Sequence, residues 1–321
     1  MAAPAPVPAA AGVFERAFRA HERFLWGLCY RLTGSAADAD DLVQDTFVRA
    51  MAHTPSGAGD TWRPWLVRVA MNLGRDLLRR RKRQPYIGPW LPSPIETSEE
   101  EPPSYEPELA DHVTTEGRYD LLESVSFAFL LALEALTPGQ RAVLLLRDVF
   151  DYTVQETADA LGMSAANVKT THHRGRAAMR DYDVQRCRPT RALQARTRAV
   201  LGQFVSAVAS GDVAAVEALL ADSVRAINDG AGEFFAARKP IVGRELVARF
   251  CVNIGRQRFL GTRFEARLVN GLPALVGTFA DDHPGYPPRG VLRCEIDADG
   301  RITRLDSILA TRKLSAMRFD G

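Results

Sequence analysis

The sequence predicts a multidomain protein in which two all-α modules precede an α+β domain. Three observations lead to this prediction. Apolar residues recur at helical spacing from residue 13 to 83 and again from 119 to 186. A stretch rich in Pro, Glu and Ser separates them, and after residue 190 short β-branched, alternating runs join the helical pattern. The chain of 321 residues is long enough for two or three such domains.

The composition is that of an ordinary globular protein, with 46% hydrophobic and 25% charged residues. The first twelve residues lack the basic start and apolar core of a signal peptide, and no apolar run is long enough to span a bilayer. We therefore expect a disordered Ala/Pro tail over 1–12, a cytoplasmic protein and no membrane partner. Cys29, Cys187, Cys251 and Cys294 are too widely spaced for a zinc site, so we expect buried free thiols, no metal and no cofactor.

The first module, residues 13–83, reads as wholly helical. Gly34-Ser35 breaks the first apolar run, and Ser35 can cap the acidic helix that follows. After a Gly/Pro loop at 54–60 comes a helix ending in LRRRKR, with Trp62 and Trp65 near its start. Arginines attract phosphates and aromatic rings can stack on unpaired bases, so this helix is suited to hold a melted DNA strand. In the alternative, Trp65, Leu66, Val69 and Leu73 are core and the arginines form a solvated end.

The second module, residues 119–186, follows a Pro-rich acidic linker at 84–118 that we expect to be extended. Two capping boxes, starting at Thr137 and Thr153, mark helix starts, Gly162 ends a helix and Ser164 caps the next. On that last helix Val168, His172, Gly175 and Met179 form one stripe. Off the stripe lie donors for reading a DNA groove: Lys169, Thr170, His173, Arg174 and Arg176. The alternative is a three-helix packing unit with a solvated basic face.

The third domain, residues 190–315, combines helices with a sheet. Helices are expected at about 193–210, 213–221 and 243–255. Antiparallel strands are expected at 262–270, 274–280, 290–300 and 301–309, with a hairpin turn at Asp297–Gly300. The helices should pack on one curved sheet.

Taken together, the two helical modules resemble an extracytoplasmic-function sigma factor of the sigma-70 family. The resemblance rests on DADDLVQDTF, on TWRPWLVRVAMNLGRDLLRRRKR and on LTPGQR…ETADALGMS…VK. It implies that 13–83 is region 2 and 119–186 is region 4. Contacts to the clamp helices of the largest RNA polymerase subunit would come from Asp38, Asp41, Leu42, Gln44, Asp45 and Phe47. The −10 promoter element would be bound by Trp62, Arg68, Asn72, Arg75, Arg79 and Arg80. The −35 element would be read by Lys169, Thr170, His173, Arg174 and Arg176.

The rest of the chain resembles a SigJ-like subgroup whose C-terminal domain is a SnoaL-like, cone-shaped α+β barrel. YIGPWLP looks like the subgroup's linker motif, NDGAG and AARKPIVG like the glycine-rich motif of the barrel, and TRKL like its C-terminal motif. Ser93 stands where the linker motif usually has an acid. The resemblance implies regulatory contacts at Trp90, Leu91, Pro92, Asp229, Lys313 and Leu314.

The resemblance implies a non-catalytic sigma factor that binds core polymerase and promoter DNA and is modulated in cis by the barrel. An unidentified small ligand in the barrel pocket is a further expected partner. One alternative is a ligand-sensing DNA-binding regulator that never contacts polymerase. Another is a cyclase-like enzyme fused to a DNA-binding region. Its acid/base candidates would be Asp229, Glu233, Asp281, Asp282 and His283, all of which also suit ordinary turns.

Overall fold

The computed structural model describes residues 9–52, 62–97, 118–258, 261–279 and 284–319, with side chains from residue 15 onward. The chain divides into two compact units. The first comprises 1–83, 101–124 and 132–185, and the second comprises 84–100, 125–131 and 186–321. Each unit is described by itself.

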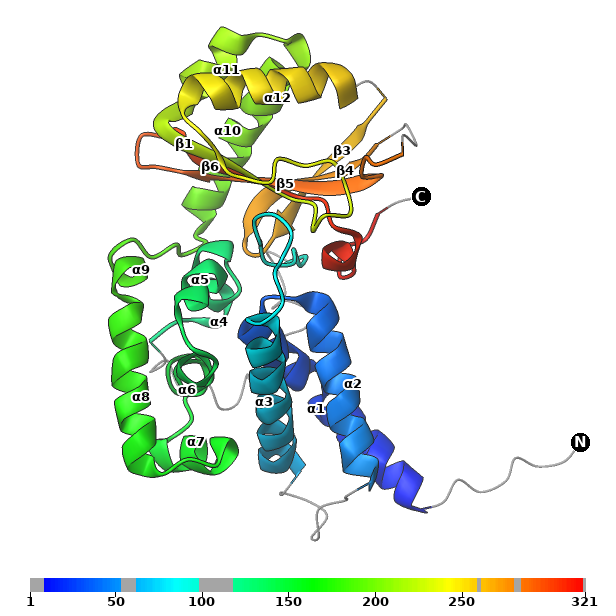
Figure 1. Cartoon of the computed structure of the whole chain (residues 1–321), viewed down its shortest axis with the longest axis vertical. Helices are drawn as coiled ribbons and strands as arrows, with labels where there is room; N and C mark the ends of the chain where they lie inside the picture. Colours follow the sequence, from blue (N-terminus) through cyan, green and yellow to red (C-terminus); the bar gives the residue numbers. More distant parts are fainter. Residues whose placement is uncertain (1–8, 53–61, 98–117, 259–260, 280–283, 320–321) are drawn as a thin grey trace, which may run out of the picture. The chain divides into compact units, whose positions relative to one another are not determined.

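The first unit begins with three long helices, α1 (Ala9–Thr33), α2 (Ala36–Ala52) and α3 (Trp62–Arg81) (Figure 1). As predicted, the Ser35 side chain accepts a hydrogen bond from the Asp38 N–H at the start of α2. Gly74 allows α3 to approach α1 closely, because a Cβ atom there would lie 2.4 Å from Leu32 Cδ2. The prediction of a disordered tail over 1–12 was wrong at its end, since α1 already begins at Ala9. Alanine is the strongest helix former, and this outweighed the preceding prolines.

The remainder of the first unit consists of shorter helices. These are α4 (Leu121–Ser124), η1 (Leu133–Ala135), α6 (Pro138–Asp148), α7 (Val154–Leu161), α8 (Ala165–Ala178) and α9 (Arg180–Val184). Both predicted capping boxes are present, Thr137 with Gln140 and Thr153 with Glu156. Gly162 ends α7 at φ 62°, a left-handed conformation that glycine adopts without strain. The helix-turn-helix is thus formed by α7 and α8.

Buried arginines join the two helical modules inside this unit. Arg31 of α1 is 2% exposed and donates to Ser124 Oγ at 2.7 Å and to the Leu121 carbonyl at 3.0 Å. Arg141 of α6 donates to the Leu32 carbonyl, also at 3.0 Å. The Leu121 carbonyl lies at the start of α4, and the Leu32 carbonyl lies in the last turn of α1, where it has no partner within the helix. The two modules therefore form one compact body.

The second unit contains a six-stranded sheet in the order β2-β1-β6-β5-β4-β3. Its strands are β1 (Leu220–Asp229), β2 (Ile241–Val242), β3 (Arg263–Val269), β4 (Leu272–Thr278), β5 (Arg289–Ile296) and β6 (Ile302–Ile308). The four predicted strands and the β5–β6 turn at Asp297–Gly300 are confirmed. The sequence analysis missed β1, which pairs in parallel with β6, and extended the preceding helix to residue 221. LADSVRAIND lacks the regular apolar alternation by which a strand is recognised.

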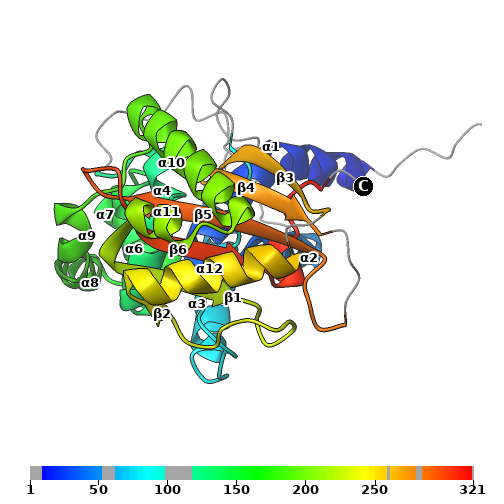
Figure 2. The same cartoon turned by 90° about the horizontal axis from the view of Figure 1, so that it is seen from above.

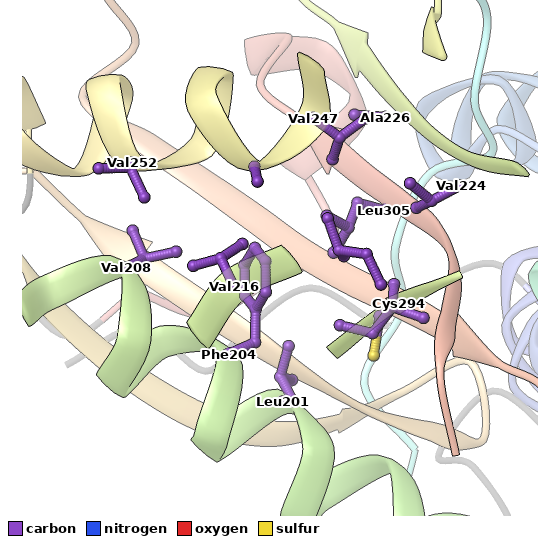
Figure 3. Packing of buried hydrophobic residues seen from close by; sticks show 13 residues of the cluster. Leu201, Phe204, Val208, Val216, Val224, Ala226, Val247, Val252, Cys294 and Leu305 are labelled. Atoms are coloured by element: carbon purple, nitrogen blue, oxygen red, sulfur yellow. The ribbon is translucent and has the colours of Figure 1, made fainter. Parts of the chain in front are cut away.

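Helices α10 (Arg191–Ser210), α11 (Val213–Leu219) and α12 (Arg244–Arg258) cover one face of this sheet (Figure 2). Figure 3 shows how their apolar side chains meet those of the strands: Phe204 and Val208 from α10, Val252 from α12 and Leu305 from β6. All are at most 2% exposed. This is the expected α+β fold with helices on one curved sheet. Of the four cysteines, Cys29 and Cys294 are buried as expected, whereas Cys187 and Cys251 are only partly buried.

The first part of the predicted linker, residues 84–97, belongs to the second unit, and 98–117 lie outside the described residues. It is not a free tether. The Thr97 N–H donates to the Leu268 carbonyl and the Asn270 N–H to the Ile95 carbonyl, both at 2.9 Å. Leu91 and Ile95 are buried, at 0% and 1% exposure. The proline-rich composition gave no sign that residues 84–97 would pack on the sheet.

Candidate functional site

Helix α8 is the candidate DNA-reading helix. Its Val168 and Met179 side chains are buried as predicted, at 0% and 1% exposure. A Cβ atom built on Gly175 would lie 3.6 Å from the Gln140 carbonyl oxygen of α6, so the two helices pack closely there. On the outer side, Lys169, Thr170, His173 and Arg174 are exposed. The helix therefore presents two cations, a hydroxyl and an imidazole on one side, which is the arrangement that groove reading requires.

Arg176, the fifth predicted reader, is held by an ion pair on α6. Its Nη2 atom lies 2.5 Å from Asp148 Oδ1, and His172 Nε2 lies 2.9 Å from Asp148 Oδ2. Burial alone would raise the pKa of the Asp148 carboxyl. The hydrogen bonds with His172 and Arg176 outweigh that effect and hold the pKa below its ordinary value. The contacts of Asp148 with His172 and Arg176, which we call the Asp148 triad, fix the orientation of α8 against α6.

Helix α3 carries the predicted −10 residues along one side. Arg68, Asn72 and Arg79 are exposed and Arg75 is half-buried between them. Arg75 Nη1 donates to the Leu161 carbonyl at 3.0 Å, and so connects α3 to the end of α7. Burial, with Arg79 nearby, lowers the pKa of this guanidinium. Arg80 is exposed on the adjacent side of the helix.

Trp62 does not lie where the sequence analysis placed it. It is 4% exposed and belongs to the core, whereas Trp65, expected in the core, is half-buried. Trp62 precedes Leu66 by four residues and Leu66 precedes Ala70 by four, so the three share the inward stripe of α3. The aromatic side chain available at this end of α3 is therefore that of Trp65.

Helix α2 separates the predicted polymerase contacts into two groups. Leu42 and Phe47 are buried, at 5% and 3% exposure, and the Phe47 ring packs edge-on against Phe18. Burial prevents their side chains from meeting a partner directly. Asp41, Gln44 and Asp45 are exposed together with Val48, at spacings that place them on one side of the helix. Asp38 is held by an ion pair with Arg81.

A third cluster lies in the second unit, where Asp229 at the end of β1 binds the linker. We call Asp229, Lys313, Tyr86 and the Leu91 backbone the clasp. The Tyr86 hydroxyl donates to Asp229 Oδ1 at 2.6 Å, and the Leu91 N–H donates to Oδ2 at 2.7 Å. Lys313 Nζ lies 2.5 Å from the same Oδ2 and also donates to the Leu91 carbonyl. Asp229 is 0% and Lys313 7% exposed, so this ion pair is shielded from water.

The other predicted regulatory residues surround the clasp. The Trp90 ring lies 4.6 Å from Lys313 Nζ, a cation–π contact. Leu91 and Leu314 share an apolar cluster with Phe127, and Pro92 is buried. Neither Tyr86 nor Asn270 was predicted from sequence to contact the linker or the barrel, although Tyr86 begins the linker motif YIGPWLP. Asn270 accepts from the Ile95 N–H and donates to the Val125 carbonyl. Its φ of 51° is a signal that only the structure shows.

The acid/base candidates of the alternative enzyme reading are engaged in structural contacts where they are described. Both oxygens of the Asp229 carboxylate accept hydrogen bonds within the clasp. The Glu233 carboxylate accepts from the Thr311 N–H at 2.9 Å and from its hydroxyl. Asp281, Asp282 and His283 lie outside the described residues.

Among the described helices, none is long and apolar enough to cross a membrane.

The helix-turn-helix and the basic helix α3 define this molecule as a DNA-binding transcription factor. Residues 17–84 match the family model "Sigma-70 region 2", and residues 126–179 match "Sigma-70, region 4". The ECF RNA polymerase sigma factor SigJ of Mycobacterium tuberculosis is 30% identical over 297 residues, which are 90% of this chain and 89% of SigJ. The probable ECF RNA polymerase sigma factor SigI of the same species is 27% identical over 309 residues, 95% of this chain and 96% of SigI.

The crystal structure of M. tuberculosis SigJ matches 95% of this chain and all of that chain, with a TM-score of 0.68 and 27% identity. The chain therefore belongs to the family of extracytoplasmic-function RNA polymerase sigma factors. Its second unit has the α+β fold that the sequence predicted, with helices packed on one sheet. The protein is a transcription initiation factor, and the family to which it belongs is not one of enzymes.

Proposed function

We propose that this sigma factor binds core polymerase through the exposed side of α2, the −10 element through α3 and the −35 element through α8. The exposed residues of each set support the assignment: Asp41, Gln44 and Asp45 on α2, Arg68, Asn72, Arg79 and Arg80 on α3, and Lys169, Thr170, His173 and Arg174 on α8. Buried Leu42, Phe47 and Trp62 serve by shaping these helices, and Arg176 by orienting α8. Asp38 and Arg75 act once their present ion pair and hydrogen bond open.

The second unit, in this proposal, controls initiation by holding the linker. The clasp is the observation that carries this part. While it is closed, residues 84–97 are fixed on the sheet and do not contribute to a free tether between the two modules. Two DNA-reading modules gain from each other only when their tether lets both reach their elements. Opening the clasp lengthens the tether.

The hydrogen bond from Arg75 to Leu161 suggests whether the closed clasp raises or lowers initiation. It occupies a residue assigned to the −10 element and joins α3 to the helix-turn-helix, so the compact unit must open before promoter DNA is fully bound. A longer tether favours that opening. We therefore propose that the closed clasp restrains initiation.

Transcription in vitro with purified core polymerase tests both parts. Full-length protein should direct initiation from a subset of a promoter pool, and Asp229→Asn should raise the yield without changing the subset. A chain ending before Thr190 lacks the barrel half of the clasp and should select the same promoters with altered yield. Equal yields from all three proteins would leave the second unit without a regulatory role. Failure of the full-length protein to bind core polymerase would overturn the whole proposal.

Both oxygens of the Asp229 carboxylate accept hydrogen bonds from the linker. This engagement supports a regulatory rather than a catalytic role for Asp229.

A further inference from the structure

The second unit encloses a cavity of about 470 Å³ between α10, α12 and the concave face of the sheet. This lies within the range of about 300–1,000 Å³ that small-molecule sites occupy. Its wall is built mostly of aromatic and aliphatic side chains, among them Phe204, Phe250, Phe264, Phe279, Leu275 and Leu292. Such a wall favours a molecule with an extended apolar surface.

One polar group in the wall is left without a partner. Asn228 of β1 is 7% exposed and lines the cavity, and its Nδ2 atom has no hydrogen-bond partner among the residues that the structure describes. Buried amide donors in native proteins nearly always have a partner, so a donor without one calls for an explanation. An acceptor oxygen on a bound molecule would satisfy it.

Arg238, Arg258, Tyr286 and Ser307 are the other polar side chains that line the cavity, and the guanidinium of Arg258 is engaged by the wall itself. The Arg258 guanidinium stacks on Phe279 and Tyr286, at 4.9 and 4.8 Å from the ring centroids, and donates to the Pro287 carbonyl. These contacts hold the two rings in place and make that wall a fixed surface.

Strand β1 connects this cavity to the clasp. Asn228 and Asp229 are consecutive, and side chains alternate between the two faces of a strand. Accordingly Asn228 lines the cavity, while Asp229 binds Tyr86, Leu91 and Lys313.

The chain after β1 makes a second connection. Residues 234–238 line the cavity and also a neighbouring pocket of about 200 Å³, to which the linker residues Ile87 and Gly88 contribute. Ile87 packs directly over Gly232, where a Cβ atom would lie 2.8 Å from Ile87 Cγ2. A molecule that orders 228–238 from the cavity side therefore acts on the surface that holds the linker.

We propose that the cavity binds an uncharged polycyclic molecule with one carbonyl or ether oxygen, which accepts a hydrogen bond from Asn228 and strengthens the clasp. The second half of this proposal rests on the proposed control of the linker. The protein would then be a sigma factor whose tether responds to a hydrophobic small molecule.

The test uses a matched pair of probes, 9-fluorenone and fluorene, which differ in the carbonyl oxygen. Full-length protein should bind fluorenone more tightly than fluorene in calorimetric titrations, by about three- to tenfold for one neutral hydrogen bond. Asn228→Leu removes the donor and should abolish this preference while still binding both probes. Leu275→Trp fills the cavity and should bind neither. Circular dichroism of both variants checks that they are folded.

The link to the clasp is read by hydrogen exchange of the peptide containing Leu91. Fluorenone at a hundred times its Kd can shift an opening equilibrium by up to about a hundredfold. We expect exchange to slow by about tenfold or more in wild type and to stay unchanged in Leu275→Trp.

Absence of probe binding at 1 mM, or equal affinities of wild type for the two probes, would overturn the ligand assignment. Binding without slower exchange would overturn the coupling. Neither result would affect the transcription test of Asp229→Asn, which is made without any ligand, so failure of this inference is distinguishable from failure of the proposed function.

Discussion

Lys313 Nζ lies 2.5 Å from Asp229 Oδ2, and the pair is buried against a linker residue that precedes Asp229 by 138 positions. The ion pair joins the end of β1 to the C-terminal turn η2 (Thr311–Leu314), and the Leu91 backbone is bonded to both partners. This one buried ion pair thus holds the first part of the linker against the end of β1 and the turn η2. The glycine-rich motif supplies Asp229 and the C-terminal motif supplies Lys313. The linker motif YIGPWLP supplies the Leu91 backbone that this pair holds.

Removing either member of this pair should release the linker. Asp229→Asn and Lys313→Met each leave a buried group without its counter-charge, which costs about 3–5 kcal/mol. Hydrogen exchange of the peptide containing Leu91 should then accelerate by about a hundredfold or more. In the double variant, the acceleration of exchange should be much smaller than the two single effects combined, because both substitutions remove the same interaction. Additive effects would mean that the two residues act separately.

Gly232 should be needed for linker packing and not merely for its backbone angle. Gly232 and Gly243 both have positive φ, at 77° and 100°, but only Gly232 faces a side chain, that of Ile87. Alanine at either position should strain the backbone by about 1–2 kcal/mol. Gly232→Ala should in addition displace Ile87 and speed exchange in the linker, whereas Gly243→Ala should not. Equal linker exchange in the two variants would show that the Ile87 contact is unimportant.

The helix-turn-helix could be predicted from sequence because its signals are local. Each capping box spans four residues, and Gly162 and Ser164 lie within the turn itself. The clasp could not be derived from local pattern, since Tyr86 and Asp229 are 143 residues apart. Only the resemblance drew attention to Asp229, Leu91 and Lys313, and it gave no geometry.

Errors within elements had a different physical origin. Strand β1 was missed because its buried positions include the polar residues Asn228 and Asp229, which lie on opposite faces, toward the cavity and toward the linker. Trp62 and Trp65 were interchanged because side chains three residues apart on a helix differ in direction by only about 60°. Spacing alone therefore does not decide which of the two rings is buried.

The Asp148 triad should make stability depend on acid pH. The native carboxyl has a lowered pKa, so its stabilising effect is fully present above the ordinary value of 3.8 and is lost as pH falls through the lower native value. Asp148→Asn should cost about 1–3 kcal/mol near pH 7. Melting temperatures of wild type and variant should therefore differ from pH 5 to 8, and the difference should shrink only as pH falls below 3.8 through the lower native value. Asp159→Asn, an exposed site on α7, is the control. A difference that does not shrink at all on acidification would contradict the assigned ion pair.

The exposed acids of α2 should govern affinity for core polymerase. Asp45→Lys reverses a charge on the side that also carries Asp41 and Gln44, without touching the buried Leu42 or Phe47. We expect the Kd for core enzyme to rise at least about tenfold, the effect of losing 1.4 kcal/mol. Glu22→Lys on α1 changes charge equally at another exposed site and should have little effect. Unchanged affinity of Asp45→Lys would remove α2 from the polymerase interface.

Arg79 and Arg80 at the end of α3 should contribute phosphate contacts. Both are exposed. Within the part of the chain that the structure describes, Arg79 forms an ion pair with Asp76, at 50% and 61% side-chain exposure, which water screens strongly. Each phosphate contact releases a counterion, so Arg79→Ala and Arg80→Ala should each reduce the slope of log K against log salt by about one. The double variant should lose about two units and bind all promoters of the pool more weakly by a similar factor. The measurement is promoter binding by the holoenzyme between 50 and 200 mM salt, roughly the range over which such slopes are resolved. Arg249→Ala, an exposed α12 arginine paired with Glu245, changes the net charge equally and should leave the slope unchanged. An unaltered slope in the double variant would show that this end of α3 does not touch DNA.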